Sequence, residues 1–232
     1  MSETAPSLSG LKAVAFDAYG TLFDVHAPMA RLAGEIGPNA ALVSELWRQK
    51  QIQYTWLRSL MGAYADFWQV TQDALDYALE AHGLATPELR AQLLALYRDL
   101  DAYTDAAPAI SALRDNGVAT AILSNGAPGM LGQAVAHAGL GALLDHVLSV
   151  DSVGIYKPAP RTYQLAVDAF GAAPGEIGFV SANPWDVAGA AYFGLAVCHL
   201  NRFSQPGENL PAKPLAVINN LSELPDLLAP AV

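Results

Sequence analysis

Residues 12–24, KAVAFDAYGTLFD, join a short apolar run to a glycine-containing turn. An apolar run from Lys12 to Phe16 ends at Asp17 and is followed by Tyr19-Gly20-Thr21. A short apolar run bounded by a turn signal predicts a buried strand. Further strands are predicted at 119–123, 146–149, 177–180 and 196–200, and helices between them at 108–116, 129–138, 161–170 and 186–193. Pro108 suits a first helical position. Strands that alternate with helices indicate an α/β fold with a parallel sheet, which we expect to be Rossmann-like.

One region breaks this alternation. From about residue 25 to residue 103 we find no convincing strand, and the stretches 42–61, 71–81 and 87–100 look helical. This block is too long for an ordinary crossover between strands. We therefore predict an inserted helical cap domain at 25–103 and a core domain formed by 11–24 and 104–232, with a flexible tail at 1–10. A cap of this kind can close over a site and exclude water.

Charge and composition exclude several classes of protein. The 22 Asp and Glu residues outnumber the 12 Lys and Arg residues, and the resulting net charge of −10 repels nucleic acids and anionic membranes. The single cysteine, Cys198, excludes an internal disulfide and a Cys-rich zinc site, and we expect an inert core thiol there. The five histidines show no metal-ligand spacing. Without a signal peptide or an 18-residue apolar run, we expect a cytoplasmic protein with no nucleic-acid or membrane partner.

Polar side chains follow the predicted strands at the points where these strands end. Ligands of open α/β sheets bind beyond the carboxyl ends of the strands, so these side chains predict a functional site. They are Asp17 and Tyr19, Ser124 and Asn125, Lys157, and Ser181 and Asn183.

Several of the candidate residues also have a purely structural interpretation. Asp17 can be a turn or cap residue rather than a carboxylate nucleophile. Asn183-Pro184-Trp185-Asp186 has the composition of a helix start, with Asn183 as N-cap, Pro184 at the first position and Asp186 in a capping box. Elsewhere, Ser124 to Gly126 is a turn signal, Lys157 is commonly solvated, Arg48 can be a surface ion-pair residue, and Tyr163 can belong to the core.

Five phrases taken together resemble the haloacid dehalogenase superfamily, and within it the L-2-haloacid dehalogenase branch. They are AFDAYGTLFDVH, LWRQKQIQYTWLRSLM, ILSNGAP, SVDSVGIYKP and FVSANPWDVAGA, and the resemblance runs from Lys12 to about Leu228. Most members of the superfamily are Mg²⁺-dependent phosphotransferases with a second Asp two residues after the nucleophile. Here Tyr19 holds that place, and the late motif carries only Asp186. A phenol is a poor proton donor to a leaving group, and the site is short of carboxylates for Mg²⁺.

The resemblance implies a catalytic role for nine residues. Asp17 is the nucleophile, Arg48 draws off the halide with help from Asn183, and Lys157 pairs with Asp17 and favours its charged form. Ser124 grips the substrate carboxylate, and Asp186 positions or activates water. Thr21 and Ser181 hold the nucleophile and its polar neighbours, and Tyr163 supports them. The resemblance also implies a substrate pocket lined by Tyr19, Gln49, Ile52, Phe67, Asn125 and Trp185.

The implied reaction is hydrolysis of short L-2-haloalkanoic acids to D-2-hydroxy acids, with inversion, through an ester of Asp17. It uses no metal and no organic cofactor, its partners are a small anionic haloacid and the halide product, and the resemblance suggests a homodimer. Two alternatives stay open: a Mg²⁺-dependent phosphatase or phosphonatase of the same fold, and a non-catalytic binding protein. Ala182 stands where relatives often have Ser, and Pro184 stands where a small residue is usual. Because Pro184 biases Asn183 toward extended geometry, we expect an altered pocket shape.

Overall fold

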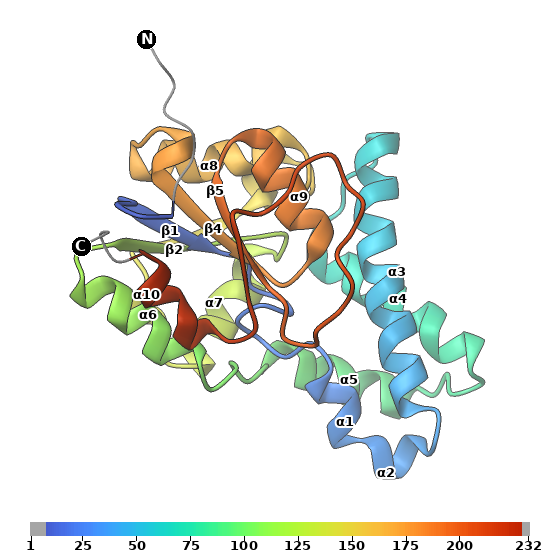
Figure 1. Cartoon of the computed structure of the whole chain (residues 1–232). Helices are drawn as coiled ribbons and strands as arrows, with labels where there is room; N and C mark the ends of the chain where they lie inside the picture. The colour runs from blue at the N-terminus through green and yellow to red at the C-terminus, as the bar shows by residue number, and fades with distance from the viewer. Residues whose placement is uncertain (1–7, 229–232) are drawn as a thin grey trace.

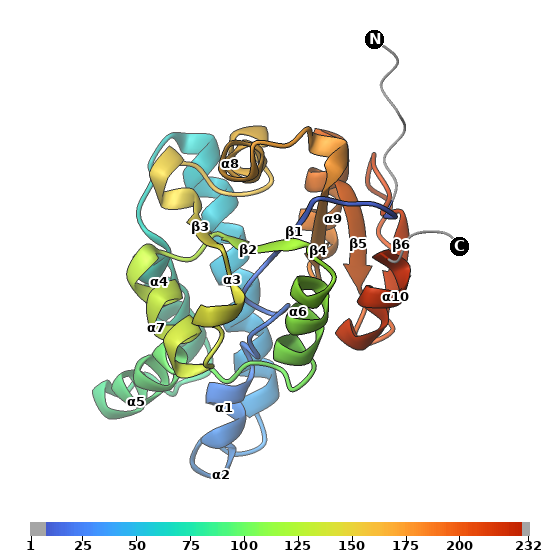
Figure 2. The same cartoon turned by 90° about the vertical axis from the view of Figure 1, so that its left-hand side faces the viewer.

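A single parallel sheet of six strands forms the centre of the protein. The computed structural model describes residues 8–228 and orders the strands β3-β2-β1-β4-β5-β6 (Figure 2). Their bounds are β1 Ala13–Phe16, β2 Ala119–Ser124, β3 His146–Ser149, β4 Ile177–Ser181, β5 Ala196–Leu200 and β6 Ala216–Ile218. All five predicted strands are present, each within one residue at either end, and the predicted α/β fold is confirmed. Strand β6 at the edge of the sheet was not predicted.

Helices cover both faces of the sheet (Figures 1 and 2). One face is covered by α8 (Pro160–Phe170) and α9 (Pro184–Phe193), and the other by α6 (Ala106–Asp115), α7 (Pro128–His137) and α10 (Leu224–Leu228). The strands are apolar on both sides because each face is buried. Their side chains accordingly fall into two clusters, with Ala15 and Phe179 in one and Val14 and Val180 in the other.

Helix α6 begins two residues earlier than predicted. It starts at Ala106, so Pro108 occupies the third helical position rather than the first. The side chain of Asp105, at the N-cap position, caps no helical N–H, because its carboxylate accepts hydrogen bonds from Arg202 and from the backbone N–H of Leu221. The start of this helix is therefore fixed by tertiary contacts, which cannot be predicted from the local sequence.

A separate group of helices lies beside one edge of the core (Figure 1). It contains α1 (Ala27–Arg31), α2 (Ala33–Ile36), α3 (Ala40–Met61), α4 (Phe67–Ala81) and α5 (Pro87–Arg98). Local signals mark the helix ends: Asp66 caps α4 through the N–H of Gln69, and Gly62 ends α3 with a φ of 65°. The 22-residue helix α3 packs along α4.

The chain enters and leaves this helical group at one place. Phe23 forms an antiparallel bridge with Ala102, and the N–H of Tyr103 donates to the carbonyl of Leu22. The adjacency of these two connections supports the predicted division into a core domain and a cap at 25–103, which we retain as a proposal. Residues 1–7 of the predicted tail lie outside the described residues. Within residues 8–228, no helix is both long and apolar enough to cross a membrane.

Candidate active site

Asp17 stands at the carboxyl end of β1, which lies between β2 and β4 in the sheet. The residue is 6% exposed, and three side chains donate hydrogen bonds to its carboxylate. Thr21 Oγ1 and Asn183 Nδ2 lie 3.1 and 2.7 Å from Oδ2, and Lys157 Nζ lies 3.2 Å from Oδ1. Three donors fix the orientation of this carboxylate, as a nucleophile at this position requires.

Lys157 is completely buried beneath the carboxylate. Its ammonium donates to Asp17, to Asp186 Oδ2 at 2.9 Å and to the carbonyl of Leu123 at 2.7 Å, so all three of its N–H groups are used. A buried ammonium needs such partners because desolvation penalises an isolated charge. The ammonium therefore joins the two carboxylates into one network.

The donor set here does not fit a magnesium site. Mg²⁺ prefers carboxylate and carbonyl oxygens, and the two carboxylates that converge here, Asp17 and Asp186, already share the Lys157 ammonium. No group of three potential metal-ligating side chains occurs within residues 8–228.

Asp186 lies in the first turn of α9 and is fully buried. Its Oδ1 accepts a hydrogen bond of 2.7 Å from the hydroxyl of Tyr163. Burial raises the pKa of Asp186 to about 6, the nearby charge of Asp17 adds to this, and Lys157 opposes it. Burial also raises the pKa of Tyr163 well above its usual value, so its phenol remains a neutral donor. Asp186 can therefore exchange a proton near neutral pH.

The turn between β4 and α9 combines a helix start with site chemistry. Asn183 occupies the N-cap position and Pro184 the first helical position, as the sequence predicted. The side chain of Asn183, however, caps no backbone N–H: it donates to Asp17 and, at 3.3 Å, to the carbonyl of Tyr19. Ser181 Oγ accepts from the N–H of Asn183 at 3.1 Å and fixes the turn. The capping interpretation thus accounts for the positions in this turn but not for the contacts of these side chains.

Arg48 is the cation that the cap brings to the site. It projects from α3, and its Nη2 donates to the carbonyl of Tyr19 at 2.9 Å and to Asn183 Oδ1 at 3.2 Å. Its Nη1 donates to Gln51 Oε1 at 2.7 Å. Among residues 8–228, no carboxylate lies within ion-pair distance of its guanidinium, so this cation is available to an anion in the cavity.

The side chains around Asp17 and Arg48 enclose a small cavity, with about 10 Å³ of free space. Of the six residues expected to line the substrate pocket, Tyr19, Ile52, Phe67, Asn125 and Trp185 do so. Gln49 does not line it and is exposed on α3. Residues 48, 52 and 55 share one face of α3, whereas position 49 is turned away by about 100°. Ser124 lines the cavity, and its Oγ accepts from the N–H of Gly126.

Two residues of α3 that the sequence analysis did not single out take part in this site. Thr55 lines the cavity, and its spacing of seven residues from Arg48 was the available signal. Gln51 is buried and bonds Arg48, Thr71 and the hydroxyl of Tyr97. A glutamine buried in a cap helix carries no sequence signal of its own, because its partners come from other helices.

Tyr19 forms an apolar wall of the cavity. It is 3% exposed and contacts the rings of Phe67 and Tyr97, whose centroids lie 5.4 and 5.8 Å away. Burial raises its pKa well above the usual value, so the phenol stays neutral. A Cβ at Gly126 would lie 2.6 Å from the Tyr19 ring, so the turn after β2 needs glycine at this position.

Comparisons with known proteins agree with this geometry. The family model described as haloacid dehalogenase-like hydrolase matches residues 11–194. The chain is 47% identical over 219 residues to (S)-2-haloacid dehalogenase 1 of Pseudomonas sp. (strain CBS-3), covering 94% of this chain and 96% of that relative. A crystal structure of a dehalogenase with an intermediate complex is 45% identical, with a TM-score of 0.94, and covers 96% of this chain and 99% of its own.

A further solved structure, L-2-haloacid dehalogenase from Xanthobacter autotrophicus with chloropropionic acid covalently bound, has a TM-score of 0.87 at 39% identity. The match covers 94% of this chain and 98% of that one. With a family model that matches most of the chain and a relative at 47% identity over nearly its whole length, this chain belongs to the haloacid dehalogenase-like hydrolases.

Proposed function

We propose that this protein hydrolyses short L-2-haloalkanoic acids to D-2-hydroxy acids with inversion at the reacting carbon. One observation carries the proposal. The Asp17 carboxylate is held by three donors at the wall of a cavity that also receives Arg48, a cation without a carboxylate partner. This arrangement provides a nucleophile and a place for a departing anion within one cavity.

In the first step, an Asp17 oxygen forms a bond to Cα of the substrate, and the carbon–halogen bond breaks with its electron pair leaving on the halide. Arg48 and Asn183 receive the halide, with Phe67 beside them, and Ser124 and Asn125 receive the substrate carboxylate. Fixed orientation in such a displacement is worth roughly 7–11 kcal/mol in well-oriented systems. Lys157, Thr21 and the turn held by Ser181 maintain that orientation.

In the second step, water attacks the carbonyl carbon of the Asp17 ester. The bond between this carbonyl carbon and the ester oxygen breaks, so the hydroxy acid leaves with an oxygen that came from Asp17. Asp186 takes the proton of the water or orients Lys157 for this transfer, with Tyr163 holding its other oxygen. The regenerated Asp17 then carries one oxygen from water.

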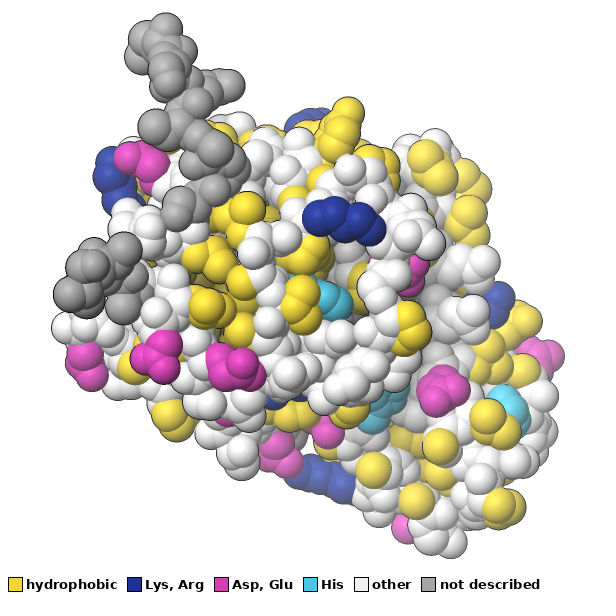
Figure 3. Space-filling view, in the orientation of Figure 1, with side chains coloured by type: hydrophobic (Ala, Val, Ile, Leu, Met, Phe, Trp, Pro, Cys, Tyr) yellow, Lys and Arg dark blue, Asp and Glu magenta, His cyan; other side chains and the backbone are white. Residues whose placement is uncertain are grey.

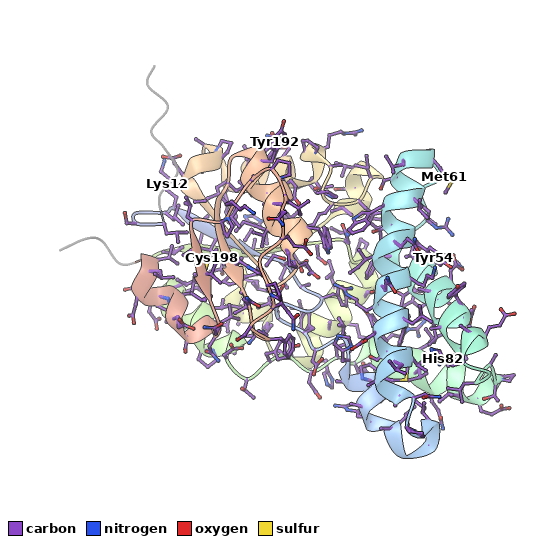
Figure 4. The ribbon with its side chains drawn as sticks, turned by 45° about the vertical axis from the view of Figure 1, so that its right-hand side comes forward. Lys12, Tyr54, Met61, His82, Tyr192 and Cys198 are labelled. Atoms are coloured by element: carbon purple, nitrogen blue, oxygen red, sulfur yellow. The ribbon has the colours of Figure 1, made fainter. Side chains whose placement is uncertain are left out.

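We propose no step through a metal, since the two carboxylates of the site are bridged by an ammonium. The absence of nucleic-acid and membrane partners remains a proposal that rests on the net charge of −10, and a cytoplasmic location also remains a proposal. A homodimer also remains a proposal. The cap helix α3 supplies an exposed apolar surface for it, with Leu60 85% and Met61 68% exposed, and Figure 4 places Tyr54 and Met61 on that helix.

The test is halide release from L- and D-2-chloropropionate in excess EDTA, with Asp17→Asn as the control. We expect release from the L form only, insensitive to the chelator and lost in the variant. A single turnover in H₂¹⁸O should place the label in the protein before it appears in product. Mg²⁺-dependent phosphate release without halide release would overturn the proposal in favour of a phosphatase, and silence in both assays would favour a binding role.

A further inference from the structure

A second cavity lies on the other side of Arg48 from Asp17. It has a volume of about 190 Å³, and Arg48, Ile52 and Asn183 line both this cavity and the catalytic one. Gly20, which has a φ of +89°, makes the connection: a Cβ there would lie 3.8 Å from Arg48 Nη2 and 4.0 Å from Asn183 Nδ2. Because glycine has no side chain, the groups that face Asp17 are also reached from this outer cavity.

The lining of the outer cavity is suited to an anion. It includes the guanidinium groups of Arg48 and Arg202 and the imidazoles of His26 and His199. No aspartate or glutamate is among its lining residues, all of which lie in the part of the chain that the structure describes. The charged side chains that line this cavity are positive, whereas the protein as a whole has a net charge of −10. Such a recess attracts anions even though the whole protein repels them.

Arg202 retains an unused donor in this lining. Its side chain is 9% exposed, forms a two-point ion pair with Asp105 at 2.7 and 2.9 Å, and donates to the carbonyl of Thr21 at 3.0 Å. The buried Nε has no hydrogen-bond partner. A buried donor without a partner is costly, and a bound anion would relieve that cost. Arg48, with no carboxylate partner, adds the net positive charge.

The histidines contribute as neutral donors rather than as cations. Burial lowers the pKa of His199, and burial together with the charge of Arg48 lowers the pKa of His26. Asp24 and Glu45, which face His26, oppose this only in part. His26 Nδ1 lies 2.8 Å from Ser44 Oγ. The attraction for an anion therefore rests on the charge of Arg48 and on the free Nε–H of Arg202, and it persists through the neutral pH range.

The outer cavity continues to the protein surface. His26, Phe203 and Gln205 line both this cavity and an open depression of about 610 Å³ against α1 and α3. The loop that carries Phe203 and Gln205 follows β5 and crosses the face seen in Figure 1, and Figure 3 shows that histidine side chains reach the surface on this same face. Three hollows thus follow one another from Asp17 to solvent.

We propose that the cavity between Arg48 and Arg202 is a binding site for a small monovalent anion, an antechamber in which the halide product or the haloacid substrate pauses between solvent and Asp17. The passage of these two anions rests on the proposed function. Binding of an anion in the antechamber does not, because it needs no turnover.

The direct test is a crystal of the resting enzyme soaked in sodium bromide, with bromide located by its anomalous scattering. We expect a bromide ion within hydrogen-bond distance of Arg202, separate from any ion on the Asp17 side of Arg48. Bromide confined to the Asp17 side at saturating concentration would overturn the proposal. This experiment gives the same answer whether or not the enzyme releases halide, so its failure is distinct from failure of the proposed function.

Charge substitutions at Gln205, where the cavity meets the surface depression, test the site in solution. Gln205 is exposed, so Gln205→Glu and Gln205→Lys should fold, and Gln53→Glu places the same negative charge on the exposed side of α3 as a control. Because Gln205 lines the cavity, we expect Gln205→Glu to weaken anion binding several-fold and Gln205→Lys to strengthen it similarly. Gln53→Glu should leave binding unchanged.

Two readouts distinguish the sources of the anion. A change confined to the bromide inhibition constant assigns the site to the departing halide, and a change confined to the KM for L-2-chloropropionate assigns it to the arriving substrate. Either change, or both, supports the antechamber when it reverses sign between Gln205→Glu and Gln205→Lys. If the two variants and the control give the same constants, the antechamber does not exist.

Discussion

Replacing Lys157 by methionine removes the positive charge that pairs with both carboxylates of the site. The Lys157 ammonium lies 3.2 Å from Asp17 and 2.9 Å from Asp186, and the side chains of Lys157, Asp17 and Asp186 are 0%, 8% and 0% exposed, respectively. At an effective dielectric constant of about 20, each pair contributes roughly 5 kcal/mol of attraction, much of which offsets the desolvation of the charges. Breaking a buried pair by removing one partner typically costs about 3–5 kcal/mol. We expect a loss of this size in the free energy of unfolding of Lys157→Met at pH 8.

The assay is urea unfolding of both proteins between pH 5 and pH 8. The difference in free energy of unfolding between Lys157→Met and the parent should become smaller as the pH falls, because the unpaired carboxylates of the variant take up protons and no longer repel each other. Lys12→Met is the matched control: its ion pair with Glu176 is exposed, and Figure 4 shows Lys12 far from the cap helix α3. That control should unfold as the parent does. A loss below about 1 kcal/mol for Lys157→Met, equal at both pH values, would refute the reasoning.

Three further outcomes are expected. The kcat should fall as the pH drops below about 6, where Asp186 becomes protonated, and a pH profile flat down to pH 4.5 would contradict that role. Gln51→Leu removes buried hydrogen bonds, so it should lower kcat/KM about tenfold and the free energy of unfolding by about 1–3 kcal/mol. Gln49→Leu, at an exposed position, should change neither quantity, and enzyme kinetics and urea unfolding would check both variants. Gly189→Ala should lower the thermal midpoint, since the new Cβ would lie 2.6 Å from the Tyr163 hydroxyl, while Gly132→Ala in open space on α7 should raise it slightly.

The sequence predicted the sheet well because its strands are short apolar runs that end in polar residues. Asp17, Ser124 and Asn183 can be grouped on sequence alone, since parallel strands bring their carboxyl ends to one edge. Strand β6 escaped prediction because it has only three residues, although all three are apolar. The resemblance to a known family supplied Arg48, which helix periodicity alone left equally compatible with a surface ion pair.

The parts that sequence did not reveal depend on contacts between distant elements. Gln49 and Gln51 are both polar residues on α3, and only the packing of α4 and α5 decides which of them is buried. The start of α6 depends on an ion pair between Asp105 and Arg202, 97 residues apart. The cavity beyond Arg48 arises where the loop after β5 meets the cap, and no local pattern encodes it.

The central place of β1 in the sheet has a consequence for how the protein is made. Asp17 leaves the ribosome well before two of its partners, because Lys157 follows it by 140 positions and Asn183 by 166. During synthesis the cap helices, whose contacts are mostly local, can form while β1 still has no neighbouring strand, because its partners β2 and β4 emerge much later. A nascent chain therefore carries its nucleophile with Thr21 beside it but without Lys157, Asn183 or Asp186, and the complete site forms only when β4 and α9 pack against β1.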